Sequence, residues 1–232
     1  GDARSSWSVQ SHLTFLVLWL LLPILLFTGF ILPEFAAVER VRYQATALDV
    51  ARRITAAVDR EVAAIQTALQ VLSGPRSIDF EDDAGIRRQV GQLRSLLGAE
   101  IVIKAVDGRL LVDSDEPHTD AGTGALTPAE RKTASTGAPS VSDILVSNGR
   151  PTISVTVPVV RDAGVTHLLG AQVLPSRIAG VLAAENLPAD WTAAVVDSQG
   201  RILARSRIHD RFVGTVATED LRRNAVRREG TW

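Results

Sequence analysis

The fold is decided by the stretch Ile101-Val-Ile-Lys-Ala-Val-Asp-Gly-Arg-Leu-Leu-Val-Asp113. Two apolar runs flank an Asp-Gly pair at positions 107 and 108, and this arrangement is a strong signal for a tight β-hairpin. Similar apolar runs, bounded by turn residues, follow further along the chain. The sequence therefore predicts strands over residues 101–106, 109–113, 140–147, 152–160 and 165–173.

The predicted strand over residues 152–160 has the clearest alternation in the chain. Alternation with a period of two is typical of a strand that turns one face to the core. Residues 161–164 read Arg-Asp-Ala-Gly and supply a turn, so this strand and the next should be adjacent and antiparallel. The two predicted faces carry Ile153, Val155, Val157 and Val159 on one side and Thr152, Ser154, Thr156 and Pro158 on the other.

Helical signals surround the strands. Residues 81–97 place apolar side chains at helical intervals, and Gly98 follows the last of them. Thr127-Pro-Ala-Glu130 has the form of a capping box with proline at the first helical position, which predicts a short helix. Another helix is expected over residues 175–185. An antiparallel sheet of about five strands backed by helices makes the predicted fold class α+β.

A second copy of the hairpin is predicted near the C-terminus. Residues 193–206 align with residues 101–114, and both copies keep Gly-Arg, a Leu and a Ser in the same order. Because each hairpin follows a predicted helix, a domain repeat explains the match better than chance does. The second copy reaches only a helix predicted over residues 218–228. We therefore expect a truncated second unit, in a chain that is a fragment at both ends.

Residues 34–73 contain neither glycine nor proline. Apolar residues recur every three or four positions from Val41 to Leu72 and approach heptad spacing toward the C-terminal end. Such a stripe fits a helix packed on its own domain, and it also fits a signalling stalk paired with a second copy. Both can hold along different parts, so we expect a long signalling helix that makes homodimer contacts.

An uncharged apolar run precedes this helix, over residues 13–32. Roughly 20 helical residues cross a bilayer, so the run predicts a transmembrane helix in the inner (cell) membrane. A cleaved signal peptide is the alternative, but residues 33–37 make a poor cleavage site and the run exceeds the usual length of about 7–15 residues. Local charge, with Arg4 before the run and Arg40 and Arg42 after it, would by itself place the following residues in the cytoplasm.

Composition excludes several classes of function. The net charge of −1 argues against nucleic acid as the main partner. The lack of cysteine excludes disulfides, thiolate metal sites and cysteine nucleophiles. No His-Glu-x-x-His, P-loop or Gly-x-Ser-x-Gly motif occurs, and the acidic stretch 113–120 lacks the spacing of a calcium loop. We therefore expect no catalytic residue, no metal site and no cofactor in this chain.

The order of these elements resembles the double Cache sensor, the PAS-like periplasmic region of bacterial transmembrane receptors, and is most similar to that of sensor histidine kinases. The resemblance rests on the membrane helix, the long helix and the two Gly-Arg hairpins. It implies a membrane-distal PAS-like (Cache) unit over residues 77–174, a linking helix over residues 175–187 and the start of a membrane-proximal unit over residues 190–232. It also implies, against the local charge, that residues after 32 face the periplasm.

For function, the resemblance implies the sensing segment of a two-component system, which binds a small molecule outside the cytoplasm. The kinase, which would use ATP and phosphorylate a response regulator, is not in this chain. A chemoreceptor, a diguanylate cyclase and a membrane-anchored assembly protein without a ligand are the alternatives. Cache domains that bind amino acids carry a tyrosine in the distal unit, whereas the only tyrosine here is Tyr43. That ligand class is therefore not favoured.

A ligand pocket is expected between the distal sheet and the helices over it, because sites of this kind are concave and lined by a few polar groups. The candidate polar residues are Arg109, Asp143, Ser154, Thr156, His167 and Gln172.

Overall fold

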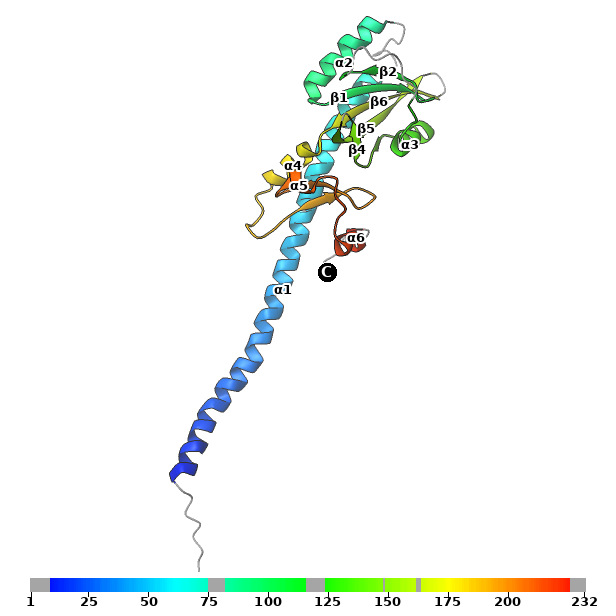
Figure 1. Cartoon of the computed structure of the whole chain (residues 1–232). Coiled ribbons are helices and arrows are strands. Elements are labelled where there is room, and N and C mark those ends of the chain that lie inside the picture. Colours follow the sequence, from blue (N-terminus) through cyan, green and yellow to red (C-terminus); the bar gives the residue numbers. More distant parts are fainter. Residues whose placement is uncertain (1–8, 75–81, 116–123, 148, 162–163, 226–232) are drawn as a thin grey trace, which may run out of the picture. The chain divides into compact units, whose positions relative to one another are not determined.

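The computed structural model describes residues 9–74, 82–115, 124–147, 149–161 and 164–225 (Figure 1). In the first helix, side chains are described at residues 15–23, at residue 27 and from residue 43 onward. The chain divides into two compact units, one that ends at Val50 and one that begins at Ala51. The predicted start of the distal unit, at residue 77, and the last residues of the second unit, 226–232, lie outside the described residues.

The first helix, α1 (Val9–Leu72), contains both the predicted span and the predicted signalling helix. These two predicted segments therefore form one continuous helix. Where side chains are described, no helix has both the length and the apolar character needed to cross a membrane. The predicted span over residues 13–32 falls partly outside that region, since the side chains of residues 13, 14, 24–26 and 28–32 are not described.

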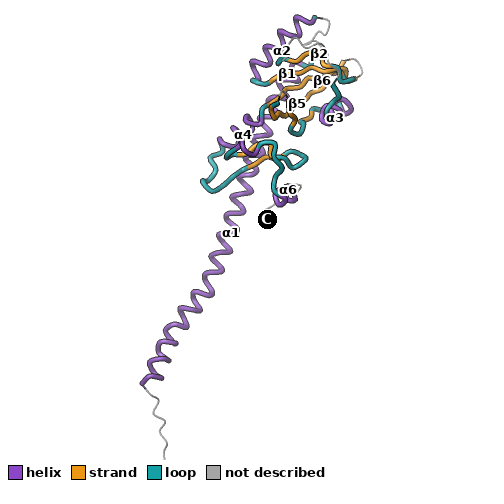
Figure 2. Tube along the Cα trace, viewed as in Figure 1, coloured by secondary structure: helices purple, strands orange, loops and turns teal. Residues whose placement is uncertain are grey.

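Six strands form an antiparallel sheet in the unit that begins at Ala51 (Figure 2). The order is β2-β1-β6-β5-β3, and β4 also pairs with β5. As predicted, the two longest strands are antiparallel neighbours. The strands are β1 (Glu100–Ala105), β2 (Leu110–Asp113), β3 (Ser140–Val141), β4 (Leu145–Ser147), β5 (Arg150–Arg161) and β6 (Gly164–Val173).

The single strand predicted over residues 140–147 is divided into β3 and β4. Between them, the Ile144 amide donates to the carboxylate of Asp197 at 3.3 Å instead of to a neighbouring strand. Because this acceptor comes from residues far away in the sequence, the local pattern gives no sign of the interruption. The division accounts for a sheet of six strands where the sequence predicted about five.

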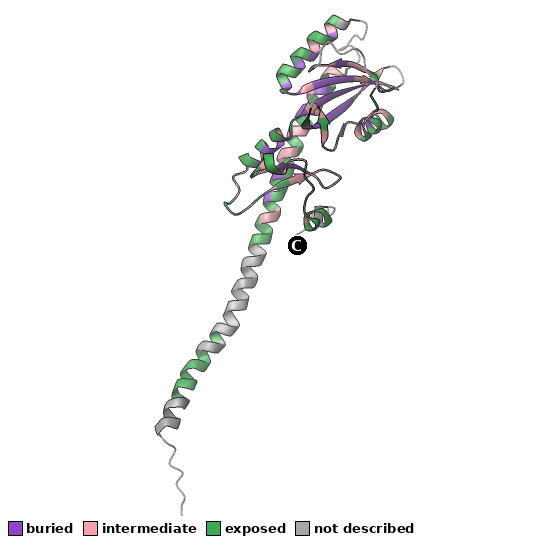
Figure 3. Ribbon diagram, viewed as in Figure 1, coloured by how far each residue is buried: buried purple, intermediate pink, exposed green. Residues whose placement is uncertain are grey.

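One face of the sheet belongs to the apolar core (Figure 3). On this face Ile153, Val155, Val157 and Val159 of β5 are all buried, as are the polar residues Thr152, Ser154 and Thr156 that alternate with them. The helix α2 (Asp83–Leu97) and the C-terminal part of α1 supply further buried residues. Full burial of one Leu or Ile side chain stabilises the fold by about 1.5–3 kcal/mol. The buried residues from these two helices include Ile65, Leu69, Ile86, Val90, Leu93 and Leu97.

The helix ends follow the local signals in the sequence. α2 begins after Asp82, whose carboxylate accepts from Gly85 N at 2.9 Å, and it ends at Gly98 with φ +57°. The capping box predicted for α3 (Pro128–Thr136) is confirmed. Thr127 Oγ1 accepts from Glu130 N at 3.2 Å, and Glu130 Oε2 accepts from Thr127 N at 2.7 Å. These bonds satisfy amides that the first helical turn leaves without partners.

The second hairpin follows α4 (Pro175–Ala184). Its strands, β7 (Ala194–Val196) and β8 (Ile202–Arg205), form a two-stranded antiparallel sheet. Two short helices come after it, α5 (His209–Phe212), which the sequence patterns do not predict, and α6 (Glu219–Ala225), which lies within the predicted range 218–228. Within α4, Arg177 Nε donates to Glu61 Oε1 of α1 at 2.5 Å, and Arg177 also donates to the Leu97 carbonyl of α2.

The two hairpins share the same hydrogen bonds. Ser114 Oγ accepts from Ile101 N at 2.8 Å, and Ser206 Oγ accepts from Ala193 N at 3.0 Å. Both turn glycines, Gly108 and Gly200, have positive φ angles of +93° and +74°. The register also shifts close to the turn in both hairpins, between Ile103 and Lys104 in the first and between Val195 and Val196 in the second. The sequence similarity between the hairpins therefore corresponds to one repeated local structure.

Candidate functional site

The second face of the six-stranded sheet carries polar side chains and lies beside α3. Residues directly opposite each other on antiparallel strands project to the same face. Ser154 pairs with Gln172, and Thr156 pairs with both Gly170 and Ser140. On the other side of β6, Gln172 pairs with Glu100. We call this set the polar face, which consists of Glu100, Lys104, Ser140, Ser154, Thr156, Gly170 and Gln172.

The centre of the polar face is formed by two buried hydroxyls beside a glycine. Ser154 Oγ and Thr156 Oγ1 lie 3.2 Å apart, and these side chains are only 7% and 1% exposed. A Cβ atom at Gly170 would lie 3.2 Å from Ser154 Oγ and 3.7 Å from Thr156 Oγ1. The backbone at Gly170 therefore lies close to both hydroxyls, and a larger residue at this position would crowd Ser154 Oγ.

Helix α3 closes one end of the polar face with a satisfied network. Lys104 Nζ donates to Glu130 Oε1 at 2.8 Å, and Glu130 is buried. Thr133 Oγ1 and Ser140 Oγ are 2.6 Å apart, and Ser140 Oγ also donates to the Ala129 carbonyl at 2.8 Å. Buried polar groups are tolerated when they are paired in this way. These contacts fix α3 against β1 and β3.

Gln172 is the exception to this pairing. Its Oε1 atom is buried and has no hydrogen-bond partner among the described residues. A buried acceptor without a donor costs about 1–3 kcal/mol of stability, and such groups are few in native proteins. Gln172 lies directly opposite Ser154, so the two side chains project to the same face of the sheet. A bound molecule with an N–H or O–H donor would satisfy the Gln172 oxygen.

The Gln172 end of the polar face is also acidic. Burial raises the pKa of Glu100 above its ordinary value, and the nearby carboxylates of Asp115 and Asp113 raise it further. A raised pKa for a carboxyl means that its surroundings disfavour another negative charge. This end of the site therefore favours a cation or a hydrogen-bond donor in its ligand.

Two of the predicted ligand residues lie away from the polar face. His167 pairs with Ala105 and Val159, which places it on the other face of the sheet. Burial there lowers the pKa of His167, and the positive charges of Arg161 and Arg109 lower it further. Arg109 is exposed at the turn between β1 and β2. The alternation of side chains along a strand could have assigned His167 and Gln172 to different faces of the sheet, because residues five positions apart point to opposite faces.

Asp143 is engaged elsewhere in the fold. Its Oδ1 accepts from Ser198 N at 2.9 Å, and its Oδ2 accepts from Ser198 Oγ at 2.8 Å. These bonds connect the segment between β3 and β4 to the turn of the second hairpin. Of the six predicted ligand residues, the structure therefore brings together Ser154, Thr156 and Gln172. Sequence reasoning missed Gly170 and Glu130, whose roles depend on the pairing of distant strands and on the packing of α3.

A hollow of about 760 Å³ lies beside α3 and is wide open to solvent. Its lining includes Val106, Leu126 and Arg131 and none of the residues of the polar face. Among the described residues, no group of three or more His, Cys, Asp or Glu side chains is arranged to hold a metal ion. The polar face is therefore the candidate site, and its chemistry is that of hydrogen bonding to a small molecule.

Solved structures with this fold are sensor domains of bacterial receptors. The sensory domain of the Campylobacter jejuni chemoreceptor Tlp3 (CcmL) with isoleucine bound matches with a TM-score of 0.63 at 12% identity, over 86% of this chain and 85% of that one. The ligand-binding domain of the same receptor in complex with L-valine gives 0.59 at 14% identity, over 82% and 81%. The sensor domain of the V. cholerae histidine kinase DctB gives 0.52 at 14% identity, over 80% and 72%.

No protein-family model matches the sequence, and no curated protein matches it either. At identities of 12–14% the structural likeness shows the fold and not the activity. The predicted α+β, PAS-like architecture is thereby confirmed, while the double Cache assignment and the kinase parent stay predictions. The chain has the Cache-type fold of bacterial sensor domains.

Proposed function

We propose that this chain is the extracytoplasmic sensing region of a bacterial transmembrane receptor, and that a small molecule binds over the polar face. The observation that carries the proposal is the buried Oε1 atom of Gln172, which has no partner among the described residues. Gln172 shares a face of the sheet with the two buried hydroxyls of Ser154 and Thr156, which lie beside Gly170. Buried polar atoms without a partner are few in native proteins and call for an explanation, which a bound ligand would supply here.

The proposed ligand carries an amino group or another N–H donor. Gln172 offers an acceptor, and the pKa of Glu100 at the same end of the site is raised, first by burial and then by the carboxylates of Asp115 and Asp113. The Tlp3 domains solved with isoleucine and L-valine support a ligand of similar size. The chain lacks a tyrosine in the distal unit, so recognition of an amino acid here would depend on Gln172 and the hydroxyls instead.

The proposal includes a membrane anchor over residues 13–32. This run is uncharged, and the described side chains in it, at residues 15–23 and 27, are exposed and apolar apart from the indole nitrogen of Trp19. A helix that is apolar on all sides is typical of a membrane span. In this proposal α1 continues from the inner membrane into the periplasm, and its apolar stripe contributes to a homodimer.

The leading form of the proposal has a histidine kinase as its output. The signal would cross the membrane to a kinase that uses ATP and phosphorylates a response regulator. The likeness to the DctB sensor domain supports this form. A chemoreceptor is the second candidate, supported by the higher TM-score of 0.63 with Tlp3. A diguanylate cyclase output and a non-sensory assembly protein are the remaining alternatives, and the sequence of the output region would decide among the four.

Two glutamines give a matched test of the ligand site. Gln89 on α2 also has a buried Oε1 atom without a partner among the described residues, but it lies off the polar face. We expect Gln172→Leu and Gln89→Leu both to raise the melting temperature of the free protein, because each removes an unsatisfied buried acceptor. Only Gln172→Leu should weaken ligand binding, by about tenfold, the equivalent of about 1.4 kcal/mol.

The measurement is thermal unfolding and titration calorimetry of the full chain against the L-amino acids, their amides and small diamines. A compound that stabilises wild type and Gln89→Leu equally, but not Gln172→Leu, would identify the ligand class and the site. Equal binding to all three proteins would remove the polar face as the site. If no compound in these three classes bound, the proposed ligand chemistry would be wrong.

A further inference from the structure

The segment between β3 and β4 and the turn of the second hairpin are connected by a reciprocal set of hydrogen bonds. We call this set the junction, and it consists of Ser142, Asp143, Ile144, Asp197, Ser198 and Arg201. From the sheet side, the carboxylate of Asp143 accepts from the backbone and side chain of Ser198 at 2.9 and 2.8 Å. Both carboxylate oxygens of Asp143 therefore hold the hairpin turn.

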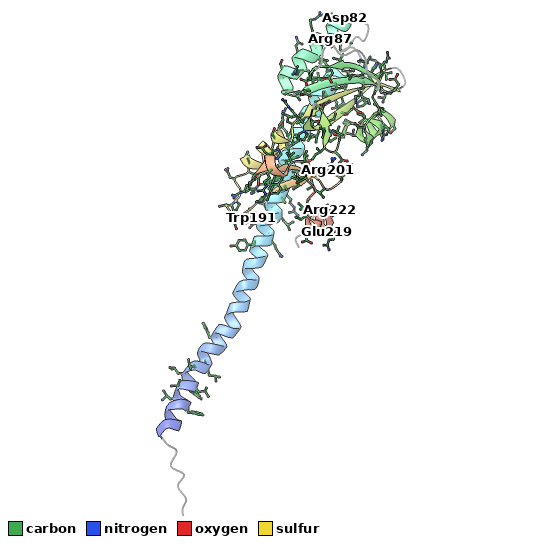
Figure 4. The ribbon with its side chains drawn as sticks, viewed as in Figure 1. Asp82, Arg87, Trp191, Arg201, Glu219 and Arg222 are labelled. Atoms are coloured by element: carbon green, nitrogen blue, oxygen red, sulfur yellow. The ribbon has the colours of Figure 1, made fainter. Side chains whose placement is uncertain are left out.

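From the hairpin side, Asp197 and Arg201 hold the backbone of Ile144 (Figure 4 labels Arg201). Arg201 Nη2 donates to the Ile144 carbonyl at 2.7 Å, and Asp197 Oδ2 accepts from the Ile144 amide at 3.3 Å. Asp197 Oδ2 also accepts from Arg201 Nε at 3.0 Å, and the Asp197 side chain is only 3% exposed. Charged groups buried in this way bind strongly when they are fully paired.

The junction is not a feature of every hairpin in this chain. In the aligned first hairpin, Ala105 stands where Asp197 stands in the second, and Arg109 stands where Arg201 stands. Both pairs keep the same backbone bond, with Ala105 N to Arg109 O at 2.8 Å and Asp197 N to Arg201 O at 2.9 Å. The carboxylate that orients the arginine is present at this position in the second copy alone. Its Oδ1 closes the turn by accepting from Gln199 N at 3.0 Å and Arg201 N at 2.8 Å, while its Oδ2 makes the contact with Ile144.

The junction is also hydrogen-bonded directly to the polar face. Ser142 N donates to the Ser154 carbonyl at 2.9 Å, and Ser154 N donates to Ser142 Oγ at 2.8 Å. The same Ser142 hydroxyl donates to the Asp143 carbonyl at 2.7 Å. Ser142 is buried, and the side chain of Ser154 faces Gly170 at the centre of the polar face. A displacement of Ser154 therefore acts directly on the backbone that carries Asp143.

We infer that the Asp143–Ser198 bonds of the junction transmit a change at the polar face to the second hairpin. The path runs from Ser154 through Ser142 to Asp143, and from there to the turn that contains Ser198. The inference rests on the proposed function in one respect, since a ligand on the polar face is what would displace Ser154 in the cell. Short chains of directional hydrogen bonds between packed elements are a physical route for such coupling.

The test uses a substitution in place of a ligand. Gly170→Ala puts a methyl group 3.2 Å from Ser154 Oγ and should displace that strand by a few tenths of an ångström. The readout is the hydrogen-exchange rate of the Ile202 and Ala217 amides, which donate to Thr215 O and Gly200 O at 2.9 Å, outside the junction. We expect Gly170→Ala to change both rates by about threefold, within the range known for coupled residues.

The same substitution is then made in Asp143→Ala, which removes the bonds to Ser198. In that background Gly170→Ala should no longer change the rates at Ile202 and Ala217. Gly91→Ala on α2 is the matched control, because its added methyl meets no atom within 4 Å. The Ile65 amide, which lies inside α1 with its side chain buried, reports global opening, and its rate is used to correct the others.

The inference would be overturned if the corrected effect of Gly170→Ala on the exchange rates persisted in the Asp143→Ala background. It would also be overturned if that effect were absent from the wild-type background. Neither result depends on a ligand. If the exchange effect fails while an amine ligand binds at Gln172, the coupling is wrong and the sensor proposal stands. If the exchange effect holds while no ligand binds, the coupling stands without the proposed function.

Discussion

At the scale of single residues, Glu100 and Gln172 lie opposite each other on β1 and β6. One is a carboxyl whose pKa is raised, first by burial and then by Asp115 and Asp113, and the other is an amide with an unsatisfied oxygen. Both features cost stability in the free protein. Groups that cost stability in the unliganded state are common at binding sites, because the ligand offsets the cost when it binds.

The raised pKa of Glu100 gives a test that depends on pH. The ordinary pKa is 4.5, and the value in the folded protein lies above it. The folded protein therefore binds this proton more tightly than the unfolded chain does, and stability falls as the pH rises through 4.5 and then through the folded pKa. Glu100→Gln carries no charge at any pH, so we expect a higher melting temperature than that of wild type at pH 7.

The difference in melting temperature between Glu100→Gln and wild type should shrink as the pH falls below 4.5, where the carboxyl is protonated in both states. Differential scanning calorimetry from pH 3.5 to pH 7.5 measures it, and the other titrating groups cancel in the comparison. A difference that stayed the same at every pH would show that the charge on Glu100 is not the cause.

At the scale of elements, α3 joins a purely local signal to the candidate site. Its capping box satisfies two backbone amides, and Glu130 of that box also binds Lys104 on the polar face. The start of the helix and the position of the ion pair are therefore set by the same carboxylate. Loss of the cap should affect both the stability of α3 and the shape of the site.

We expect Thr127→Ala to lower stability by about 1 kcal/mol, because Glu130 N loses its acceptor. For a chain of this size that corresponds to a decrease in melting temperature of about 2–4 °C. Thr127→Ser keeps the hydroxyl and should restore most of the loss. Ser135→Ala, at an exposed position of the same helix, is the control and should change the melting temperature by less than about 1 °C. An equal loss in Thr127→Ser and Thr127→Ala would argue against the cap.

The elements that sequence predicted well are those whose signals are local. The α3 capping box, the stop at Gly98 and the Asp-Gly hairpin each depend on fewer than about ten consecutive residues. The division of the 140–147 strand could not be predicted, because its cause is the bond from Ile144 to Asp197, far along the chain. The same limit applies to the site. The alternation of β5 predicts that its hydroxyls share one face. The position of Gly170 beside them depends on the pairing of β5 with β6.

At the scale of the whole molecule, the sheet, α4 and the second hairpin belong to one compact unit that begins at Ala51. The hairpin repeat places the same local structure at two points of this unit, and only the second copy carries the Asp197–Arg201 pair that reaches back to the sheet. The fold therefore contains the polar face, to which we propose a ligand binds, and a set of hydrogen bonds that connects it to the second hairpin. A sensor needs both, because recognition without a route to another part of the protein carries no signal.

The orientation of the chain in the membrane is the remaining property of the whole molecule. Local charge, with Arg40 and Arg42 after the apolar run, points to the cytoplasm, whereas the proposed sensor requires the periplasm. We expect alkaline phosphatase fused after Arg53 to be active in a bacterial host, because long domains are translocated largely regardless of nearby charge. A cytoplasmic reporter at the same position should be inactive, and deletion of residues 13–32 should reverse both results. If the cytoplasmic reporter were active and the phosphatase inactive, the polar face would lie inside the cell. The extracytoplasmic proposal would then be wrong.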